Sequence, residues 1–215
     1  SRHRKNLKLL FPKLFILSVP ASGRVINKDI KFADDIILDL NDAIKEKADI
    51  AIVASPSPYH AMHTKLLLKA GIPSLIEKPV TNNSQDAREL IKIQSETGIP
   101  VSIGYCLRYL PSSIKMKELI DQCVIGNIYN SFVSVGQYLP DWRKTNEYKH
   151  SVSAKKSLGG GALFELSHEI DYIQWLLGSM EVHYAQLRSS TELNLEVEEL
   201  ADVVLVTDKG AVCTV

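Results

Sequence analysis

The sequence predicts an α/β protein, in which a partial parallel sheet is followed by an α+β domain with a mostly antiparallel open sheet. In the first half, short apolar runs alternate with helix-like segments across short links, which is typical of βαβ units. Near Gly104 the rhythm changes to longer alternating segments, and Asp208-Lys209-Gly210 is a hairpin turn signal. We therefore expect two domains, 1–104 and 105–215.

The composition is that of an ordinary globular chain without a dominant charge. Of the 215 residues, 45% are hydrophobic and 23% are charged, and 25 basic residues balance 25 acidic ones. This balance creates no overall field toward nucleic acid or an anionic membrane, and no apolar run approaches the roughly 20 residues that span a bilayer. The cysteines Cys106, Cys123 and Cys213 are widely spaced, so we expect free thiols and a cytoplasmic protein.

The chain opens on a basic segment, residues 1–10, which is typical of a solvated helix that ends at Phe11-Pro12. A first strand is expected at 14–19. Because the chain begins without a methionine and inside a helix-like pattern, we expect the natural chain to begin earlier.

The loop that follows this strand, residues 20–24, contains no acidic residue. In Rossmann-type sheets a carboxylate near this point holds the ribose diol of NAD, whereas an arginine accommodates the 2′-phosphate of NADP. Ser22 and Arg24 therefore favour NADP over NAD. An ordinary Ser-Gly turn explains the same residues without a ligand, and this alternative stays open.

The rest of the first domain is predicted to alternate strands and helices. A short helix at 42–47 is capped by Asn41, and Gly71 ends the helix that runs to residue 70. A longer helix begins at Asn83 or Ser84 and is closed by Gly98 after residue 97. The predicted strands are 49–54, 73–76 and 101–105.

The second domain is predicted to contain longer elements. A helix at 111–123 leads into an alternating strand at 128–138, and a polar and aromatic loop occupies 139–148. A single helix is expected from the triple glycine at 159–161 to residue 177. Strands at 182–187, 200–207 and 211–215 complete the expected sheet.

The strand at 73–76 ends on Glu77-Lys78-Pro79, at the edge where ligands bind in open α/β sheets. A lysine placed there faces a pocket, and burial would lower its pKa unless the neighbouring carboxylate offset that effect. A surface Glu–Lys pair at a strand exit is the plainer alternative.

A second group of polar residues lies on the helix expected at 159–177. Glu165, His168 and Asp171 follow one another at i, i+3 steps beside an apolar stripe, so their side chains can meet. A histidine between two carboxylates is a candidate general base, and a solvated polar face is the alternative. We expect no metal site, because no third and fourth ligand join this trio or the pair His60 and His63. The glycines before the helix indicate a close approach of the backbone to a ligand or a neighbouring strand.

Three motifs in this order resemble the Gfo/Idh/MocA family of sugar oxidoreductases. They are the strand and loop at 49–60, the Glu77-Lys78-Pro79 signature, and the glycine-led segment 159–171 that carries His168. The first seven residues resemble the segment that follows the family's Gly-x-Gly-x-x-Gly turn, which places the first strand and the phosphate-binding glycines upstream. One departure concerns Glu165: it lies three residues before His168, whereas many members have an aspartate four residues before the histidine.

The resemblance implies hydride transfer between a carbon of a sugar or nucleotide sugar and the nicotinamide of NAD or NADP. His168 would take or return the hydroxyl proton with help from Asp171 or Glu165. Lys78 would donate a hydrogen bond to the reacting oxygen, across a cleft between the two domains. The implied cofactor contacts are Ser22, Arg24, Ser55, Pro56, His60, Glu77 and Lys78, and the implied substrate contacts are Tyr105, Arg108, Trp142 and Arg143.

Other functions stay open at this point. A glycosidase or lyase that uses bound NAD transiently fits the same motifs, and a non-catalytic dinucleotide or sugar sensor would need neither Lys78 nor His168. For Arg108, a salt bridge between the domains is an alternative to substrate binding. The C-terminal sheet is expected to pair subunits into a homo-oligomer, as the resemblance implies.

Overall fold

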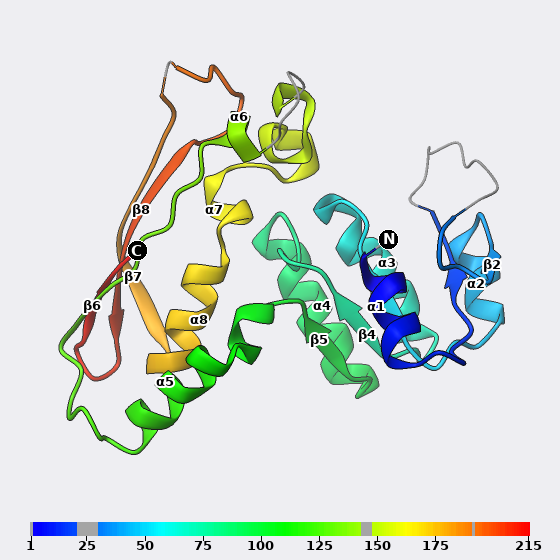
Figure 1. Cartoon of the computed structure of the whole chain (residues 1–215), viewed down its shortest axis with the longest axis horizontal. Coiled ribbons are helices and arrows are strands. Elements are labelled where there is room, and N and C mark those ends of the chain that lie inside the picture. The colour runs from blue at the N-terminus through cyan, green and yellow to red at the C-terminus, as the bar shows by residue number, and fades with distance from the viewer. Residues whose placement is uncertain (1, 21–29, 143–147, 191) are drawn as a thin grey trace. The chain divides into compact units, whose positions relative to one another are not determined.

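The computed structural model describes residues 2–20, 30–142, 148–190 and 192–215 (Figure 1). Ser22, Arg24 and Arg143, three of the predicted ligand contacts, lie outside these ranges. The chain divides into two compact units, Ser1–Gly104 and Tyr105–Val215, and each is described by itself. Among the described residues no helix is long and apolar enough to cross a membrane.

Unit 1 contains short parallel strands and the helices that flank them. Strands β1 and β2 pair in parallel, and β3, β4 and β5 form a separate three-stranded parallel sheet with β4 in the middle. This sheet confirms the predicted parallel arrangement. The elements of unit 1 are α1 (Arg2–Leu10), β1 (Leu17–Ser18), β2 (Asp35–Ile36), α2 (Leu40–Lys45), β3 (Ala51–Val53), the 3₁₀ turn η1 (Ser57–Tyr59), α3 (His60–Lys69), β4 (Ser74–Ile76), α4 (Ser84–Thr97) and β5 (Val101–Ile103).

Local capping explains where the helices of unit 1 begin and end. The side chain of Asn83 accepts a hydrogen bond from the Asp86 N–H, and Gly98 adopts the left-handed conformation that ends α4, as predicted. The prediction for α2 was wrong, because Asp39 and not Asn41 caps it. The Asp39 carboxylate accepts hydrogen bonds from the backbone N–H groups of Asn41 and Asp42, so the helix begins two residues earlier.

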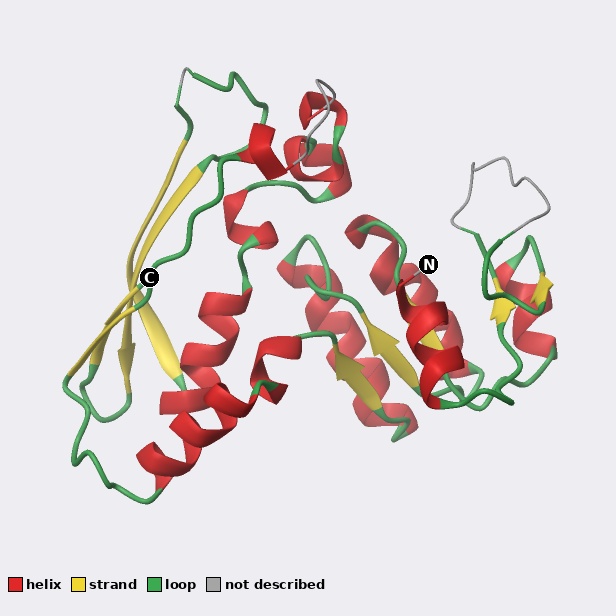
Figure 2. Cartoon of the chain, viewed as in Figure 1, coloured by secondary structure: helices red, strands yellow, loops and turns green. Residues whose placement is uncertain are grey.

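A compact apolar core holds α3 and α4 against the parallel sheet. Its buried residues come from the strands, from α3 and α4, and from the link between α3 and β4: Val53, Ala61, Leu67, Ile72, Ile76 and Leu90. Figure 2 shows the helices of unit 1 beside the short strands. The core fixes the carboxyl ends of β3 and β4, from which the candidate cofactor loops start.

Unit 2 contains a mixed four-stranded sheet in the order β6-β9-β8-β7. The β7–β8 and β8–β9 pairs are antiparallel, which agrees with the predicted, mostly antiparallel sheet. Helix α8 packs on the sheet through Ile173, which lies in one buried cluster with Val203, Leu205 and Cys213. The elements of unit 2 are the 3₁₀ turn η2 (Cys106–Tyr109), α5 (Pro111–Asp121), β6 (Asn130–Phe132), α6 (Leu139–Trp142), the 3₁₀ turns η3 (Tyr148–His150), η4 (Val152–Ala154) and η5 (Lys156–Leu158), α7 (Ala162–Glu165), α8 (His168–Leu177), β7 (Met180–Arg188), β8 (Leu200–Thr207) and β9 (Val212–Thr214).

The strand predicted at 128–138 is much shorter in the structure. Only Asn130–Phe132 is a strand, and it pairs in parallel with Val212–Thr214. The side chain pattern of 128–138 alternates beyond these three residues, but the partner strand β9 is itself three residues long. Strand β6 thus pairs with β9 over three residues.

The single helix predicted at 159–177 is interrupted. Helix α7 ends at Glu165, the backbone at Leu166 (φ −106°, ψ 26°) leaves the helical region, and α8 begins at His168. The two halves are attached to different partners, because α7 contacts the turn η4 and the segment before β8, whereas α8 packs on the sheet. The predicted i, i+3 series of Glu165, His168 and Asp171 on one helix is therefore wrong at Glu165.

Candidate functional site

The first candidate segment follows the carboxyl end of β4, and we call residues 77–79 the β4 exit. The Glu77 N–H donates to the Val53 carbonyl (2.9 Å), which continues the parallel ladder by one residue. The Glu77 carboxylate lies 2.6 Å from His3 Nε2 of helix α1 and accepts a 3.2 Å hydrogen bond from the Lys78 N–H. Lys78 thus follows the middle strand of the sheet directly, with the preceding carboxylate held in place by α1.

The loop after β3 is joined to the β4 exit by a buried histidine. The ring of His60, only 1% exposed, has Nδ1 at 2.9 Å from the Pro79 carbonyl oxygen and Nε2 at 2.7 Å from that of Ser55. The two loops that leave neighbouring parallel strands are therefore tied together through one imidazole. Both ring nitrogens of His60, predicted as a cofactor contact, lie against backbone carbonyl oxygens of these loops.

A second histidine, His63 of helix α3, contacts the same loop. His63 Nδ1 lies 3.1 Å from the Ser55 hydroxyl, and its ring stacks on Tyr59 with centroids 6.1 Å apart. Burial, with a smaller contribution from neighbouring His60, lowers the pKa of the His63 imidazole below its ordinary value. Ser55 is thus fixed from two sides, by His60 at its carbonyl and by His63 at its hydroxyl.

The parallel sheet fits a dinucleotide cofactor at this edge. Ligands of open α/β sheets bind outside the carboxyl ends of the strands, and the loops after β3 and β4 are both at that edge and linked to each other. They carry four of the predicted cofactor contacts: Ser55, Pro56, Glu77 and Lys78.

The second candidate segment is the start of helix α8 in unit 2. Arg108 of η2 donates two hydrogen bonds to the Asp171 carboxylate, from Nε (2.8 Å) and Nη2 (2.5 Å). The Asp171 side chain is 9% exposed and that of Arg108 is 39% exposed. The hydrogen bonds to Asp171 raise the pKa of the Arg108 guanidinium. Both residues were predicted at the site, and the structure joins them to each other within one unit.

Tyr105, the residue just before η2, supports the same segment. Its ring meets the His168 ring edge to face, with centroids 5.5 Å apart and an interplanar angle of 81°. Its hydroxyl lies 3.5 Å from Ser167 Oγ, the residue before His168. Burial raises the pKa of Tyr105, so the phenol stays protonated and able to donate. The imidazole of His168 is therefore positioned by an aromatic neighbour at the first residue of α8.

A cavity of about 300 Å³ lies between α6, α7 and the start of β8, and we call it the acidic cavity. Trp142 and Glu165, two of the predicted site residues, line it together with Tyr138. Ser153 Oγ donates to Glu165 Oε1 at 2.8 Å, which ties α7 to the turn η4. The structure thus places Glu165 in a cavity wall, on a different helix from His168.

The triple glycine allows two close approaches. A Cβ at Gly160 would lie 2.5 Å from the carbonyl oxygens of Val152 and Ser153, and a Cβ at Gly161 would lie 2.2 Å from the Glu198 carboxylate. Gly161 also has φ +114°, a conformation that disfavours other residues. The glycines therefore let α7 begin against η4 and against Glu198 of the acidic cavity.

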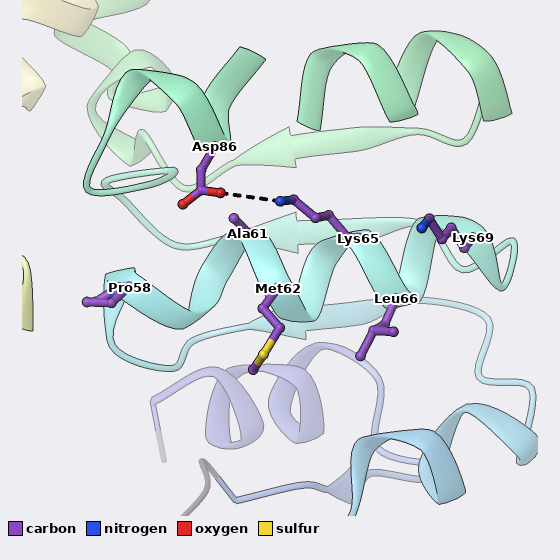
Figure 3. Close-up of a pocket in the computed structure, with 7 residues that line it drawn as sticks. All are labelled: Pro58, Ala61, Met62, Lys65, Leu66, Lys69 and Asp86. Atoms are coloured by element: carbon purple, nitrogen blue, oxygen red, sulfur yellow. Dashed lines mark hydrogen bonds and ion pairs between the residues drawn. The ribbon is translucent and has the colours of Figure 1, made fainter. Parts of the chain in front are cut away.

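A second hollow, of about 310 Å³, runs along helix α3 in unit 1. Figure 3 shows Met62 and Leu66 on one side of α3, while Lys65 reaches Asp86 of α4 on the other, at 3.2 Å. Lys65 also pairs with Glu89, so its charge is neutralised within the unit. This groove contains none of the predicted site residues.

The residues of these sites that were not predicted from the sequence include His3, Glu198 and Glu199. His3 contacts Glu77 across 74 residues, and Glu198 and Glu199 line the acidic cavity. No local periodicity connects them to the motifs. Among the described residues no group of three or more His, Cys, Asp or Glu side chains is arranged to hold a metal ion.

Comparison with protein families gives two matches that follow one another along the chain. Residues 23–105 match the model described as "Oxidoreductase family, NAD-binding Rossmann fold", and residues 113–215 match the GFO/IDH/MocA C-terminal domain.

Curated relatives and solved structures give a consistent result. The chain is 26% identical over 164 residues to the scyllo-inositol 2-dehydrogenase (NADP(+)) of Bacillus subtilis, covering 74% of this chain and 43% of the relative. It is also 26% identical over 164 residues to the 2,7-anhydro-N-acetylneuraminate hydratase of Mediterraneibacter gnavus, covering 75% and 41%. The fold resembles that of the WlbA dehydrogenase from Bordetella pertussis, in a complex with NADH and UDP-GlcNAcA, with a TM-score of 0.69 at 24% identity, covering 84% of this chain and 51% of that one. The chain thus spans about half the length of these three proteins or less.

Proposed function

Because the chain belongs to the Gfo/Idh/MocA family of NAD-binding oxidoreductases, we propose that the whole protein is an NAD(P)-dependent dehydrogenase. Its substrate is a sugar or nucleotide sugar, and the reaction interconverts a secondary alcohol and a ketone. The observation that carries the proposal is the arrangement of Glu77 and Lys78 directly after the middle strand of the parallel sheet, with the neighbouring loop tied to it by His60.

The loops after β3 and β4 would hold the cofactor, with Ser55, Pro56 and Glu77 on its binding edge. When bound, the nicotinamide cofactor accepts or donates the hydride. Ser22 and Arg24, outside the described residues, are our candidates for the contact to a 2′-phosphate, and we therefore propose NADP as the preferred cofactor. The relative from Bacillus subtilis that carries NADP(+) in its name supports this choice.

His168 is the proposed acid–base group for the hydroxyl proton. The edge contact with Tyr105 fixes the ring plane, and the first position of α8 keeps the imidazole at the end of an element. Asp171 acts as a positioning residue, because both of its oxygens bond to Arg108 and hold α8 to η2. Glu165 and Trp142, on the wall of the acidic cavity, are proposed to bind the sugar.

Lys78 is proposed to donate a hydrogen bond to the reacting oxygen. An ammonium in this role stabilises the negative charge that develops on the oxygen while the proton leaves. The position of Lys78 after the carboxyl end of β4 supports this role, because ligands of open α/β sheets bind outside the carboxyl ends of the strands.

Single substitutions in the whole protein test the proposal. Lys78→Ala and His168→Ala should each lower kcat by about 10²–10⁴-fold, which is typical of a lost acid–base contribution, and lower kcat/KM equally. The dissociation constant for NADP, measured by isothermal titration, should change little, because neither group is assigned to the phosphates. Turnover close to wild type in either variant would overturn the proposed mechanism.

A second candidate is a hydratase or lyase that oxidises and re-reduces its substrate. The similarity to the 2,7-anhydro-N-acetylneuraminate hydratase favours keeping it. The two candidates differ in the net reaction, since a dehydrogenase changes the nicotinamide absorbance in proportion to product and a hydratase or lyase does not. Product formation without a net change in this absorbance would select the second candidate.

Assembly through the C-terminal sheet is also part of the proposal. Strand β7 is at one end of the sheet, and Val182 (64%), Tyr184 (52%) and Leu187 (51%) expose apolar surface along it. Burying such a surface between two copies would stabilise a homo-oligomer. Light scattering of the whole protein gives the mass of the assembly, and a monomer would refute this part of the proposal.

A further inference from the structure

The carboxylate of Glu77 lies where three segments of unit 1 meet. The first of them is helix α1, whose His3 places Nε2 at 2.6 Å from Glu77 Oε1. A carboxylate only accepts hydrogen bonds, so His3 Nε2 carries the proton and donates it. This contact joins the first turn of α1 to the end of β4, and both side chains are about one-third exposed.

The second segment is the end of β5, which faces the carboxylate through a glycine. The Gly104 N–H donates to the Ile76 carbonyl at 2.7 Å, so Gly104 lies beside Glu77. A Cβ at Gly104 would be 3.0 Å from Glu77 Oε2 and 3.4 Å from the Glu77 Cα. The φ of Gly104 is not positive, so the glycine is not required by the backbone conformation. It provides space for the carboxylate.

The third segment is Lys78 itself. The oxygen that faces Gly104, Glu77 Oε2, accepts a hydrogen bond from the Lys78 N–H at 3.2 Å. The peptide between Glu77 and Lys78 is therefore held by this carboxylate, while the Glu77 N–H is held by the Val53 carbonyl. Both oxygens of the carboxylate accept from protein atoms, one from α1 and one from the residue that follows β4.

The position of this peptide matters for a group that acts on a reacting atom. Displacing such a group by 1 Å can lower the rate by about 10²-fold. If the Glu77 carboxylate moves, the Lys78 N–H loses its acceptor and the Lys78 backbone is free to turn. The ladder hydrogen bond of Glu77 to Val53 does not prevent this, because it holds the residue before the peptide.

We propose that Glu77 is a positioning residue for Lys78, and that His3 and Gly104 hold its carboxylate in place. The inference rests on the proposed function, in which Lys78 donates to the reacting oxygen. It deepens that function, because Glu77 then acts on the substrate through Lys78, and a residue of α1 and a glycine of β5 become part of the catalytic arrangement.

Hydrogen exchange of the Lys78 amide tests the positioning without turnover. In the whole protein with ¹⁵N-labelled lysine, the amide signal that is lost in Lys78→Arg identifies Lys78. In His3→Ala the carboxylate can turn away, so exchange of this amide should be about fivefold faster, as for the loss of one hydrogen bond. His3→Gln, whose amide can still donate, should recover part of the protection.

Gly104→Ala disturbs the same carboxylate while both of its partners remain. The added methyl group requires the carboxylate to shift by a few tenths of an ångström, so the Lys78 amide should again exchange faster. Gly136→Ala is the matched control, since a Cβ at Gly136 would meet no described atom within 4 Å. It should leave the exchange of Lys78 unchanged.

Two further controls separate positioning from a general loss of stability. Lys5→Ala changes an exposed side chain of α1. Ile93→Val removes a methyl group from the buried side of α4 and should lower the stability by an amount comparable to His3→Ala. Neither should alter the exchange of the Lys78 amide, because this amide is held by a local contact.

Kinetics of the dehydrogenase reaction test the consequence for catalysis. His3→Ala and Gly104→Ala should each lower kcat and kcat/KM by about tenfold. The dissociation constant for NADP, measured by isothermal titration, should stay within about twofold in these variants and in Glu77→Gln. The controls Lys5→Ala and Ile93→Val should keep the kcat of the wild type.

The results separate this inference from the proposed function. Unaltered exchange of the Lys78 amide in both His3→Ala and Gly104→Ala would overturn the inference whatever reaction is found, and so would faster exchange with an unchanged kcat. Weaker NADP binding by Glu77→Gln with an unchanged kcat would show a direct cofactor contact and overturn it as well. Faster exchange in these two variants but not in the controls, in a protein that oxidises no sugar, would support the positioning and refute the dehydrogenase.

Discussion

The β4 exit and the start of α8 carry the two proposed catalytic side chains, and they are supported in different ways. At the β4 exit a backbone hydrogen bond, from the Glu77 N–H to the Val53 carbonyl, adds to the side-chain contacts of His3 and His60, and no side-chain substitution removes it. At the start of α8 the positioning contacts are made by side chains, through the Arg108–Asp171 pair and the Tyr105–His168 contact. Side-chain support can be removed by one substitution, so we expect the α8 segment to be the more sensitive of the two.

The largest loss of stability is expected for the Arg108→Ala substitution, which acts on the α8 segment. Removing the guanidinium leaves the Asp171 carboxylate, only 9% exposed, without its two donors. An unsatisfied buried acceptor costs about 1–3 kcal/mol, and the partial exposure of Arg108 keeps the expected value within that range. Urea unfolding of the whole protein measures the loss of the free energy of unfolding, and kcat should fall with it because α8 carries His168.

Two controls sharpen this prediction. Arg108→Lys keeps the charge but not the two-pronged geometry, so its stability should lie between those of the wild type and the alanine variant. Lys115→Ala breaks an exposed pair with Glu118 on α5 and should cost at most about 1 kcal/mol. An Arg108→Ala variant as stable as Lys115→Ala would show that the ion pair does not support α8.

A smaller effect is expected at the β4 exit from His3→Ala. The substitution removes the 2.6 Å contact with Glu77, but the backbone hydrogen bond of Glu77 to Val53 stays. The loss of one partly exposed hydrogen bond should cost about 0.5–1.5 kcal/mol. His3→Gln, whose amide can still donate, should recover part of it in the same urea measurement.

The comparison of the two segments depends on the difference in stability loss between the His3→Ala and Arg108→Ala variants. If His3→Ala destabilises the protein more than Arg108→Ala, side chains and not the backbone position the β4 exit, and the proposed asymmetry is wrong.

The smallest expected effect is a pH dependence of the free energy of unfolding that arises from His63. Its pKa in the folded protein is below the ordinary value of 6.5, chiefly because of burial. The unfolded chain therefore takes up a proton more readily, so the stabilisation is present above about pH 6.5 and is lost as the pH falls through the lower pKa of the folded state. His63→Gln cannot titrate, and its free energy of unfolding should fall less than that of the wild type on acidification from neutral pH. An identical slope in the two proteins would refute the assignment.

The parallel sheet and the helices of unit 1 were predictable because their signals are local. The bounds of α4 follow from Asn83 and Gly98, which lie next to the helix they limit. In unit 2 the decisive partners are distant in sequence. Strand β6 pairs with β9, about 80 residues later, and α7, which ends before His168, contacts Ser153 and Glu198.

In the candidate site, too, the features set by local sequence were predictable, whereas those set by distant contacts were not. The sequence places Lys78 after a strand and His168 on a helix, and both positions follow from local patterns. It assigns Asp171 to His168 from helical spacing, whereas in the structure the Asp171 carboxylate bonds to Arg108, which is 63 residues away. Contacts of this kind depend on how η2 folds back on α8, and no local pattern encodes that.

The measurement that tests the central claim most directly is the turnover of the Lys78→Ala/His168→Ala double variant of the whole protein. If both groups act on one reacting hydroxyl, as we propose, their losses are not additive, and kcat of the double variant should be little lower than that of the poorer single variant. Losses that multiply would show that the β4 exit and the start of α8 serve independent steps, and the account would be contradicted.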